Sequence, residues 1–322
     1  MTFTQLEIFV MVAEMRGFTL AALRLGISQS AVSHAIRALE TELSVQLVER
    51  QQSAVEVTEL GRRLLVRARE ILGLAEAMRQ DAAVARGLNQ GLIRIGSFGP
   101  TSSLKLLPAI LRAYRARYPG IEVQIDEGPD AAVIQWVADR RVDVGFAVLP
   151  DERFDTVPLV EDQLVALLQR DHPLAGKRSV GLHELVDQPF IMPEQGCSAL
   201  VEPLFAQAGL APQVRYRMSQ MVTVLGLVDT GDGITVMPEL ALPDAMHATH
   251  PRIVARPLRP MVKRRVGLVF RSLAQASPAV KAFAEIAQVA AKGVGDRRVD
   301  GSAVHAVIRS GSDLAHGLAA VD

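Results

Sequence analysis

The chain has 322 residues, which is more than a single hydrophobic core usually organises, so two or three compact units are expected. Hydrophobic residues make up 49% and charged residues 22%, a composition that argues against wholesale disorder and against a membrane protein. Basic and acidic residues number 35 each, so the net charge gives no sign of nucleic-acid binding.

The beginning of the chain and its cysteine content indicate where the protein works. The first 17 residues carry acidic side chains within a short apolar stretch and have no basic lead-in, so no signal peptide is predicted. No apolar run reaches the length of a membrane span. Cys197 is the only cysteine, which rules out an intrachain disulfide and a cysteine-rich zinc site. We therefore expect a cytoplasmic, nucleoid-associated protein without membrane contact, metal or cofactor.

Three helices are predicted at the start of the chain. Apolar residues recur at three- and four-residue steps over residues 5–16, as in an amphipathic helix that ends at Gly17. A short helix over residues 20–25 follows Thr19, and Gly26 turns the chain. Ser28 is a typical N-cap for a third helix that runs to about residue 43. Two helices joined by a glycine-containing turn form a helix-turn-helix.

The third helix has one polar and one apolar face when its residues advance by about 100° each. The polar face contains Gln29, Ser30, Ser33, His34 and Arg37. The apolar face contains Ala31, Val32, Ala35, Ile36, Leu39 and Leu43. Such a polar face fits the major groove of DNA, where Arg37 has two donors for a guanine and Gln29 can pair with an adenine. Most polar helix faces are merely solvated, and the helix alone leaves that alternative open.

A longer string carries a more specific signal: FTLAALRLGISQSAVSHAIRALETELSVQLVER, continued by VTELGRRLLVRAREIL. It closely resembles, without a gap over about the first 85 residues, the winged helix-turn-helix and linker helix of LysR-type transcriptional regulators. The resemblance implies an all-α DNA-binding domain over residues 1–58, whose five polar residues face the groove of double-stranded promoter DNA. It also implies that Arg50 and Thr58 flank the wing and touch the DNA backbone.

The wing departs from the family pattern. Residues 51–57 contain no arginine or lysine, and Glu56 adds a negative charge. Each phosphate that a cation neutralises adds to affinity and to salt dependence. We therefore expect weak binding by a single module, which a dimer or tetramer strengthens.

From Val57 onward, the sequence predicts a long helix with a partner. Its seam alternates four- and three-residue steps, as in a coiled coil, through Val57, Gly61, Leu64, Ala68, Ile71, Ala75, Met78, Ala82 and Ala85. Alternatively, this seam packs onto the next domain of its own chain. The resemblance implies a linker helix over residues 59–87 that forms a homodimer on an interrupted inverted repeat, with a homotetramer as the expected assembly. Residues 88–91 are predicted to be a hinge.

The rest of the chain alternates strand and helix patterns, which predicts an α/β domain with mostly parallel strands over residues 92–292. Open sheets of this class bind ligands beyond the carboxyl ends of their strands, often at helix N-termini. Residues 100–103 are expected at such a place. The region resembles the LysR substrate-binding domain, which has two subdomains and is similar in shape to periplasmic binding proteins.

This second resemblance implies an effector site between the subdomains. Its expected contacts are Thr101, Ser102, Phe146, Pro193, Gln195, Gly196, Cys197, Ser198, Met221 and Thr223. Because this lining has no arginine or lysine, helix termini and hydroxyls are expected to hold a small carboxylate; an aromatic metabolite fits as well. Each hydroxyl is equally consistent with a helix cap. Cys197 is either a redox-active thiol or a buried small side chain.

Other functions have less support. The chain has no GxSxG elbow, no GxxxxGK[ST] loop and no GxGxxG after a strand, so an enzyme is not expected. His247 and His250 have no partner at metal spacing. A solute-binding protein of a transporter is not expected either, because the helix-turn-helix opposes that function. Residues 293–322 are predicted to be a disordered tail, with a short helix over residues 303–308 as an alternative. RNA polymerase is left open as a partner.

Overall fold

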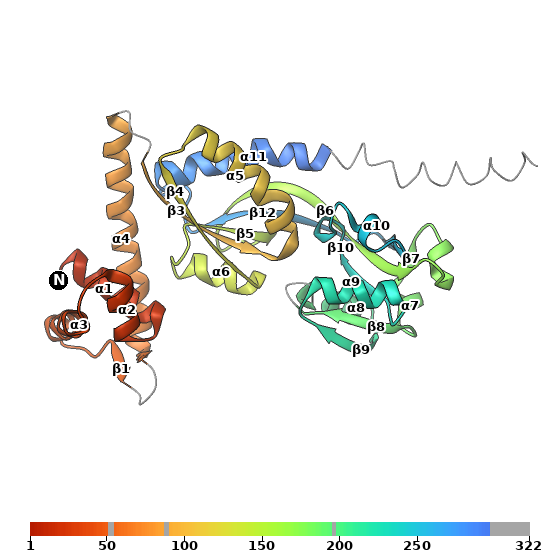
Figure 1. Ribbon diagram of the computed structural model, residues 1–322, viewed down its shortest axis with the longest axis horizontal. Helices are drawn as coiled ribbons and strands as arrows, with labels where there is room; N and C mark the ends of the chain where they lie inside the picture. Colours follow the sequence, from red (N-terminus) through yellow and green to blue (C-terminus); the bar gives the residue numbers. More distant parts are fainter. Residues whose placement is uncertain (51–54, 87–89, 195–197, 297–322) are drawn as a thin grey trace, which may run out of the picture.

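The structure is a computed structural model that describes residues 1–50, 55–86, 90–194 and 198–296. Figure 1 shows a helical head, one long helix that rises from it, and an elongated α/β body beside that helix. None of the helices in these four ranges is long and apolar enough to cross a membrane.

The head consists of three helices and a short hairpin around one core. Its elements are α1 (Phe3–Met15), α2 (Phe18–Leu25), α3 (Gln29–Leu43), β1 (Val48–Arg50) and β2 (Val55–Val57). Phe9, Val12, Ile36 and Leu39 are buried at its centre. The predicted helix-turn-helix is confirmed, although α1 starts earlier than predicted because the Thr2 hydroxyl accepts a hydrogen bond from the backbone N–H of Gln5.

The long helix α4 (Glu59–Ala85) is fixed to the head at its first turn. The Thr58 hydroxyl accepts a hydrogen bond from the backbone N–H of Gly61 at 2.8 Å and donates one to the carbonyl of Gln46 at 2.9 Å. A Cβ on Gly61 would lie 2.2 Å from the carbonyl oxygen of Leu47, so this close approach requires glycine. The helix therefore leaves the head in a defined direction.

The body is an α/β domain, as predicted. Its strands are β3 (Gly91–Phe98), β4 (Ile121–Gly128), β5 (Val144–Leu149), β6 (Asp155–Gln169), β7 (Val180–Gly181), β8 (Pro189–Pro193), β9 (Gln213–Met218), β10 (Thr235–Pro238), β11 (Ile253–Arg259) and β12 (Lys263–Phe270). Its helices are η1 (Thr101–Leu106), α5 (Leu107–Arg117), α6 (Asp130–Ala138), η2 (Pro173–Gly176), α7 (Leu182–Leu185), α8 (Ser198–Gln207), α9 (Met221–Thr230), η3 (Glu239–Ala241), α10 (Met246–Thr249) and α11 (Pro278–Asp296).

The ends of the body differ from the sequence-based expectation. Gly91, predicted to belong to the hinge, is the first residue of β3. Residue 87, the predicted end of the linker helix, and residues 88 and 89 of the predicted hinge lie outside the described residues. Helix α11 continues to Asp296, past the predicted end of the domain at residue 292. The predicted alternatives for residues 297–322 also lie outside the described residues.

Strand direction differs between the strands that lie within one half of the body and the strands that cross between its two halves. In the main sheet, with the order β4-β3-β5-β12-β6-β11-β7, strand β3 pairs parallel with β4 and β5. Strands β8 and β9 form a separate parallel pair. The long strand β6 and the returning strand β12 pair antiparallel with each other and with their other neighbours. The expectation of mostly parallel strands is therefore wrong for the strands that cross between the two halves.

Two separate groups of hydrophobic clusters define two subdomains. The first subdomain, nearer α4 in Figure 1, buries Ile95, Tyr114 and Phe283. The second buries Phe190 and Phe205, with a further cluster beneath α9. Strand β6 contributes side chains to both groups, so the backbone connection between the subdomains is itself part of each core.

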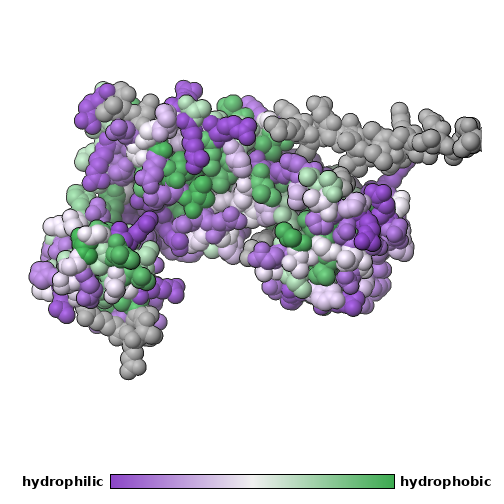
Figure 2. Space-filling view, in the orientation of Figure 1, coloured by the Kyte–Doolittle hydropathy of each residue, from purple (hydrophilic) through white to green (hydrophobic). Residues whose placement is uncertain are grey.

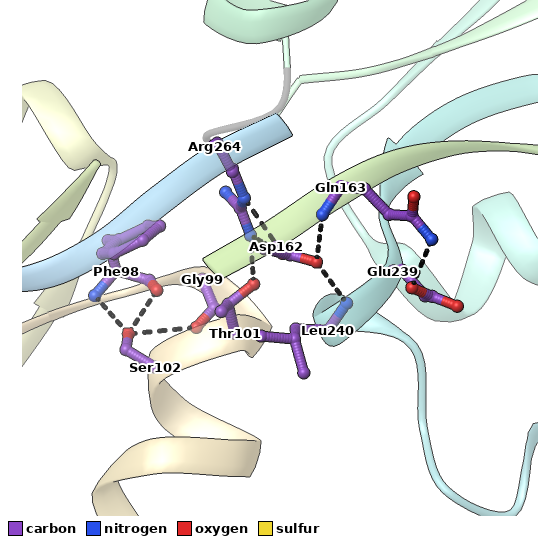
Figure 3. A network of polar contacts seen from close by, with 9 residues as sticks. All are labelled: Phe98, Gly99, Thr101, Ser102, Asp162, Gln163, Glu239, Leu240 and Arg264. Carbon is purple, nitrogen blue, oxygen red and sulfur yellow. Dashed lines mark hydrogen bonds and ion pairs between the residues drawn. The ribbon is translucent and has the colours of Figure 1, made fainter. Parts of the chain in front are cut away.

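A buried ion pair lies where β6 and β12 cross between the subdomains (Figure 3). Asp162 and Arg264 face each other in register, and their side chains are 0% and 6% exposed. The Asp162 Oδ2 accepts from Nε and Nη2 of Arg264 at 3.0 and 2.7 Å. Its Oδ1 accepts from the backbone N–H groups of Gln163 and Leu240 at 2.8 and 3.1 Å. One carboxylate thus joins both crossing strands to η3.

We predict that Asp162→Asn lowers the free energy of unfolding by about 3 kcal/mol, because it leaves a buried guanidinium without its counter-charge. The neighbouring change Glu161→Gln should cost about 0–1 kcal/mol, since that carboxylate is 67% exposed and lies 3.7 Å from Lys263. Urea unfolding of the full chain, followed by circular dichroism, measures both. Equal losses in the two variants would contradict the role assigned to the buried pair.

Candidate functional site

The outer face of α3 presents four of the five polar residues predicted to read DNA. Gln29, Ser30, His34 and Arg37 are exposed. The Ser28 hydroxyl accepts a hydrogen bond from the backbone N–H of Ala31 at 3.2 Å, which confirms the predicted N-cap. The helix therefore begins where its first polar side chains can point away from the head.

Ser33 is a correction. Its side chain belongs to the buried set, with the residue 9% exposed, and so it does not share the open face. At about 100° per residue, Ser33 lies only about 60° from Ile36 on the helix, and Ile36 is fully within the core. The observed polar face is rotated toward His34, which leaves Ser33 at its covered edge.

The structure also exposes residues that the sequence analysis missed or placed on the apolar face. Ala31 is exposed, and Leu43 is 37% exposed, although both were expected to face the core. Thr41 is exposed one turn beyond Arg37 and donates its hydroxyl to the Arg37 carbonyl at 2.8 Å. Extending the helical count by one turn would have added Thr41, which lines a shallow surface hollow with Arg37.

The two residues predicted to flank the wing are Thr58 and Arg50. Thr58 is the N-cap of α4, with its hydroxyl engaged with Gly61 and Gln46. Arg50 ends β1 opposite Val55, and its side chain lies outside the described part of the structure. Contact of either residue with DNA remains a prediction.

Thr101 and Ser102 of the expected effector site are satisfied within the protein. Ser102 is fully buried; its hydroxyl pairs with Ser97 at 2.9 Å and accepts from the backbone N–H of Phe98 at 3.0 Å. Thr101, which is 2% exposed, accepts a hydrogen bond from Arg264 at 2.5 Å. Ser102 does not act as the expected helix cap, because Pro100 is the N-cap of η1 and no side chain caps that helix, but its hydroxyl is satisfied by β3. Thr101 belongs to the buried network in Figure 3.

The remaining expected effector contacts are spread over both subdomains. Phe146 is a correction, because it is fully buried in the core of the first subdomain, where β5 pairs with β12. Pro193 is buried at the end of β8. On α9, Met221 is half-buried and Thr223 is exposed. Gln195, Gly196 and Cys197 lie outside the described residues, as does the side chain of Ser198.

Two charged residues near this region were missed by the sequence analysis. Arg264 reaches Thr101 from β12, so an arginine that the sequence analysis did not name contacts one of the expected effector residues. Asp130, the first residue of α6, lines a cavity of about 410 Å³ together with Val148 and Asp151. Burial raises the pKa of Asp130, although the Val148 N–H and the charge of Arg264 oppose this effect. The sequence holds no signal for either position, because each depends on which strands become neighbours.

Within the described residues, no group of three or more histidine, cysteine or acidic side chains is arranged to hold a metal ion.

The predicted seam of α4 divides into two parts. Gly61, Leu64, Ala68 and Ile71 pack within their own chain, against the core of the head. Met78 is 68% exposed, and Ala82 and Ala85 are exposed as well. The first half of the seam thus packs neither on a partner helix nor on the following domain, as the two predictions had it, but on the head of its own chain.

Two family models match the chain. The model described as bacterial regulatory helix-turn-helix protein, lysR family, matches residues 3–62, and the LysR substrate binding domain matches residues 86–292. An uncharacterized HTH-type transcriptional regulator of Bacillus subtilis, YvbU, is 35% identical over 89% of this chain and 98% of its own. The probable HTH-type transcriptional regulator LrrA of Synechococcus elongatus is 33% identical over 89% and 96%.

Solved structures give the same relationship. A full-length OxyR variant from Pseudomonas aeruginosa superposes with a TM-score of 0.72 at 25% identity, covering 89% of this chain and 98% of its own. Full-length CbnR, solved in complex with its target DNA, has a TM-score of 0.58 at 25% identity and covers 90% and 100%. The helix-turn-helix, the linker helix and the two-part α/β body therefore make this chain a member of the LysR family, a DNA-binding transcriptional regulator with an effector-binding domain and not an enzyme.

Proposed function

We propose that this regulator reads promoter DNA through the exposed face of α3 and that a small molecule bound between its two subdomains controls it. The observation that carries the first part is the open polar face of Gln29, Ser30, His34 and Arg37 on a helix whose other side is anchored in the core. Thr41 extends this face by one turn. Because the net charge of the chain is zero, side-chain placement rather than overall charge brings it to DNA.

We predict that Arg37→Ala weakens binding to a selected operator by about 1–3 kcal/mol and relaxes preference at one base position, because two guanidinium donors are lost from the groove. Arg112→Ala removes the same charge from an exposed site on α5 and serves as the control. Selection from random DNA with the wild-type protein supplies the operator, and fluorescence anisotropy measures the affinity. A uniform loss across all sequences would make Arg37 a phosphate contact instead.

The second half of α4 supports pairing of two chains. Leu74 and Met78 are 53% and 68% exposed, and Ala82 and Ala85 continue the same exposed side of the helix. Exposed apolar side chains along one helix are typical of a surface that a partner helix covers. A pair of α4 helices would place two α3 faces on an inverted repeat and compensate for the wing, which has no lysine or arginine in residues 51–57.

We predict that Met78→Glu shifts the protein toward monomer and steepens the concentration dependence of operator binding, because a carboxylate would have to be buried between the helices. Met261→Glu is the matched control, since Met261 is 57% exposed on the body near the crossing strands. Sedimentation equilibrium measures the assembly state. If Met78→Glu leaves the assembly unchanged, the pairing surface lies elsewhere.

The effector is proposed to bind beside the crossing strands. Arg264 and Thr101 are buried there and bonded to each other, so a ligand would have to replace that bond to contact them, while Asp130 lines a cavity of about 410 Å³ in the first subdomain. Met221 and Thr223 are the proposed contacts from the second subdomain. A small molecule with a carboxylate or an aromatic ring suits this set. Its binding would change the angle between the subdomains and, in a tetramer, the spacing of two DNA-bound pairs, which bends or relaxes the promoter.

A thermal-shift screen of the full chain against metabolites tests the site. A ligand at about a hundred times its dissociation constant should add about 2.7 kcal/mol to stability. Thr101→Val should reduce the shift caused by the ligand that the screen identifies, because it removes a polar contact. Thr249→Val, an exposed hydroxyl on α10, should leave the shift unchanged. A shift that survives Thr101→Val in full would place the ligand away from the crossing strands.

A further inference from the structure

One polar contact joins the head, the linker helix and the effector-binding body. Arg69, on α4, has a side chain that is 11% exposed. Its Nη2 contacts Glu14 of α1 at 3.1 Å, and its Nη1 donates to the backbone carbonyl of Asp139 at 3.3 Å. A single guanidinium therefore contacts the DNA-binding head on one side and the body on the other.

A second arginine completes the contact from the side of the body. Arg140, in the turn that ends α6, adopts a left-handed conformation with a φ of 53° and places its Nη2 2.9 Å from Glu70 of α4. Glu70 also accepts from Arg67 at 2.9 Å. The hydrogen bond from Arg67 and the charges of Arg140, Arg67 and Arg271 lower the pKa of Glu70, so this carboxylate is ionised at neutral pH.

The contact combines partly buried ion pairs with hydrogen-bond donors that have no partner among the described residues. The Arg140 and Glu70 side chains are 25% and 26% exposed, so water screens them only in part. The Nε atoms of both Arg69 and Arg140 are buried without a hydrogen-bond partner in the described part of the chain. Buried N–H donors left unpaired oppose the attraction of the ion pairs. Because attraction and unpaired donors oppose each other, the contact between α4 and the body can form in one arrangement of the chain and open in another.

Helix α6 links this contact to the other end of the first subdomain. Its first residue, Asp130, lines the cavity of about 410 Å³, and its last turn leads directly to Asp139 and Arg140. A helix this short moves as a unit, because its interior hydrogen bonds resist bending. A displacement at the Asp130 end therefore has a physical route to α4.

We propose that Glu14, Arg69, Glu70, Asp139 and Arg140 are positioning residues: their α4–α6 contact sets the orientation of the DNA-binding head on the body. Its link to the effector through Asp130 rests on the proposed function. The orienting role itself does not, since it follows from contacts present without any ligand. Opening the contact frees α4 and the head attached to it from the body, and closing it holds them in one orientation on the body.

The test compares the full-length wild type with Glu70→Gln, Arg140→Gln and the double variant. Arg79→Gln is the control, since it removes a charge from α4 and breaks a pair, at 3.4 Å from Glu76, that stays within the helix. Hydrogen exchange of the amides of residues 138–142 is measured without DNA. Bending of the selected operator is measured by energy transfer between dyes on its two ends, and thermal unfolding monitors the fold.

In each contact variant, exchange of these amides should be faster by about fivefold or more, and the bend angle of the operator should change, at an unchanged thermal midpoint. The double variant should match the single variants, because the two side chains act as one pair. Unchanged exchange, or an Arg79→Gln variant that behaves like the others, overturns the proposal. If no variant or wild type binds DNA, the proposed function fails, and the exchange data still decide the role of the contact.

Discussion

The buried pair of Asp162 and Arg264 is the interaction on which the rest of the effector-binding body depends. Removing a carboxylate and a guanidinium from water is costly, and only their mutual attraction with further hydrogen bonds offsets that cost. The pair therefore demands one register between β6 and β12. Strand β12 in turn pairs with β5, and β6 with β10 and β11, so both subdomains inherit that register.

The same constraint shapes the proposed effector site. Arg264 is held by Asp162 and donates to Thr101, so a group that a ligand would contact is tied to the crossing itself (Figure 3). A ligand that competes for this guanidinium or hydroxyl acts on the junction between subdomains rather than on a distant wall. Ser102, one residue away, is turned inward and satisfied by Ser97 and Phe98. The neighbouring hydroxyls of Thr101 and Ser102, at the start of η1, thus point to different partners: Thr101 contacts Arg264, and Ser102 contacts β3.

Helix α4 packs against both the head and the body. Its first half is buried against the head and fixed there by Thr58 and the absence of a side chain at Gly61. Its second half keeps Leu74 and Met78 exposed while neighbouring turns contact the body. The space-filling view in Figure 2 shows hydrophilic residues along the outer surfaces with hydrophobic residues gathered in patches on the head and the body. A helix shared in this way gives the body a physical connection to the head, because both are in contact with it.

The sequence by itself determined the helices of the head and the linker and the alternation of strands and helices in the body, although it did not single out α6, β9, β11 or α11. The period of apolar residues and the caps at Ser28 and Thr58 place the helices of the head, because these signals act within a few residues along the chain. The tertiary structure decided which side chains are free to act. Ser33 and Phe146 look available in the sequence and are buried in the structure. Arg264 gains its position from strand pairing with a segment more than a hundred residues away, and Asp130 gains its position from the packing of α6 on β5. Local spacing fixes the direction of a side chain relative to its own helix or strand, but only the packing of separate elements decides whether that direction leads to water, to the core or to a ligand.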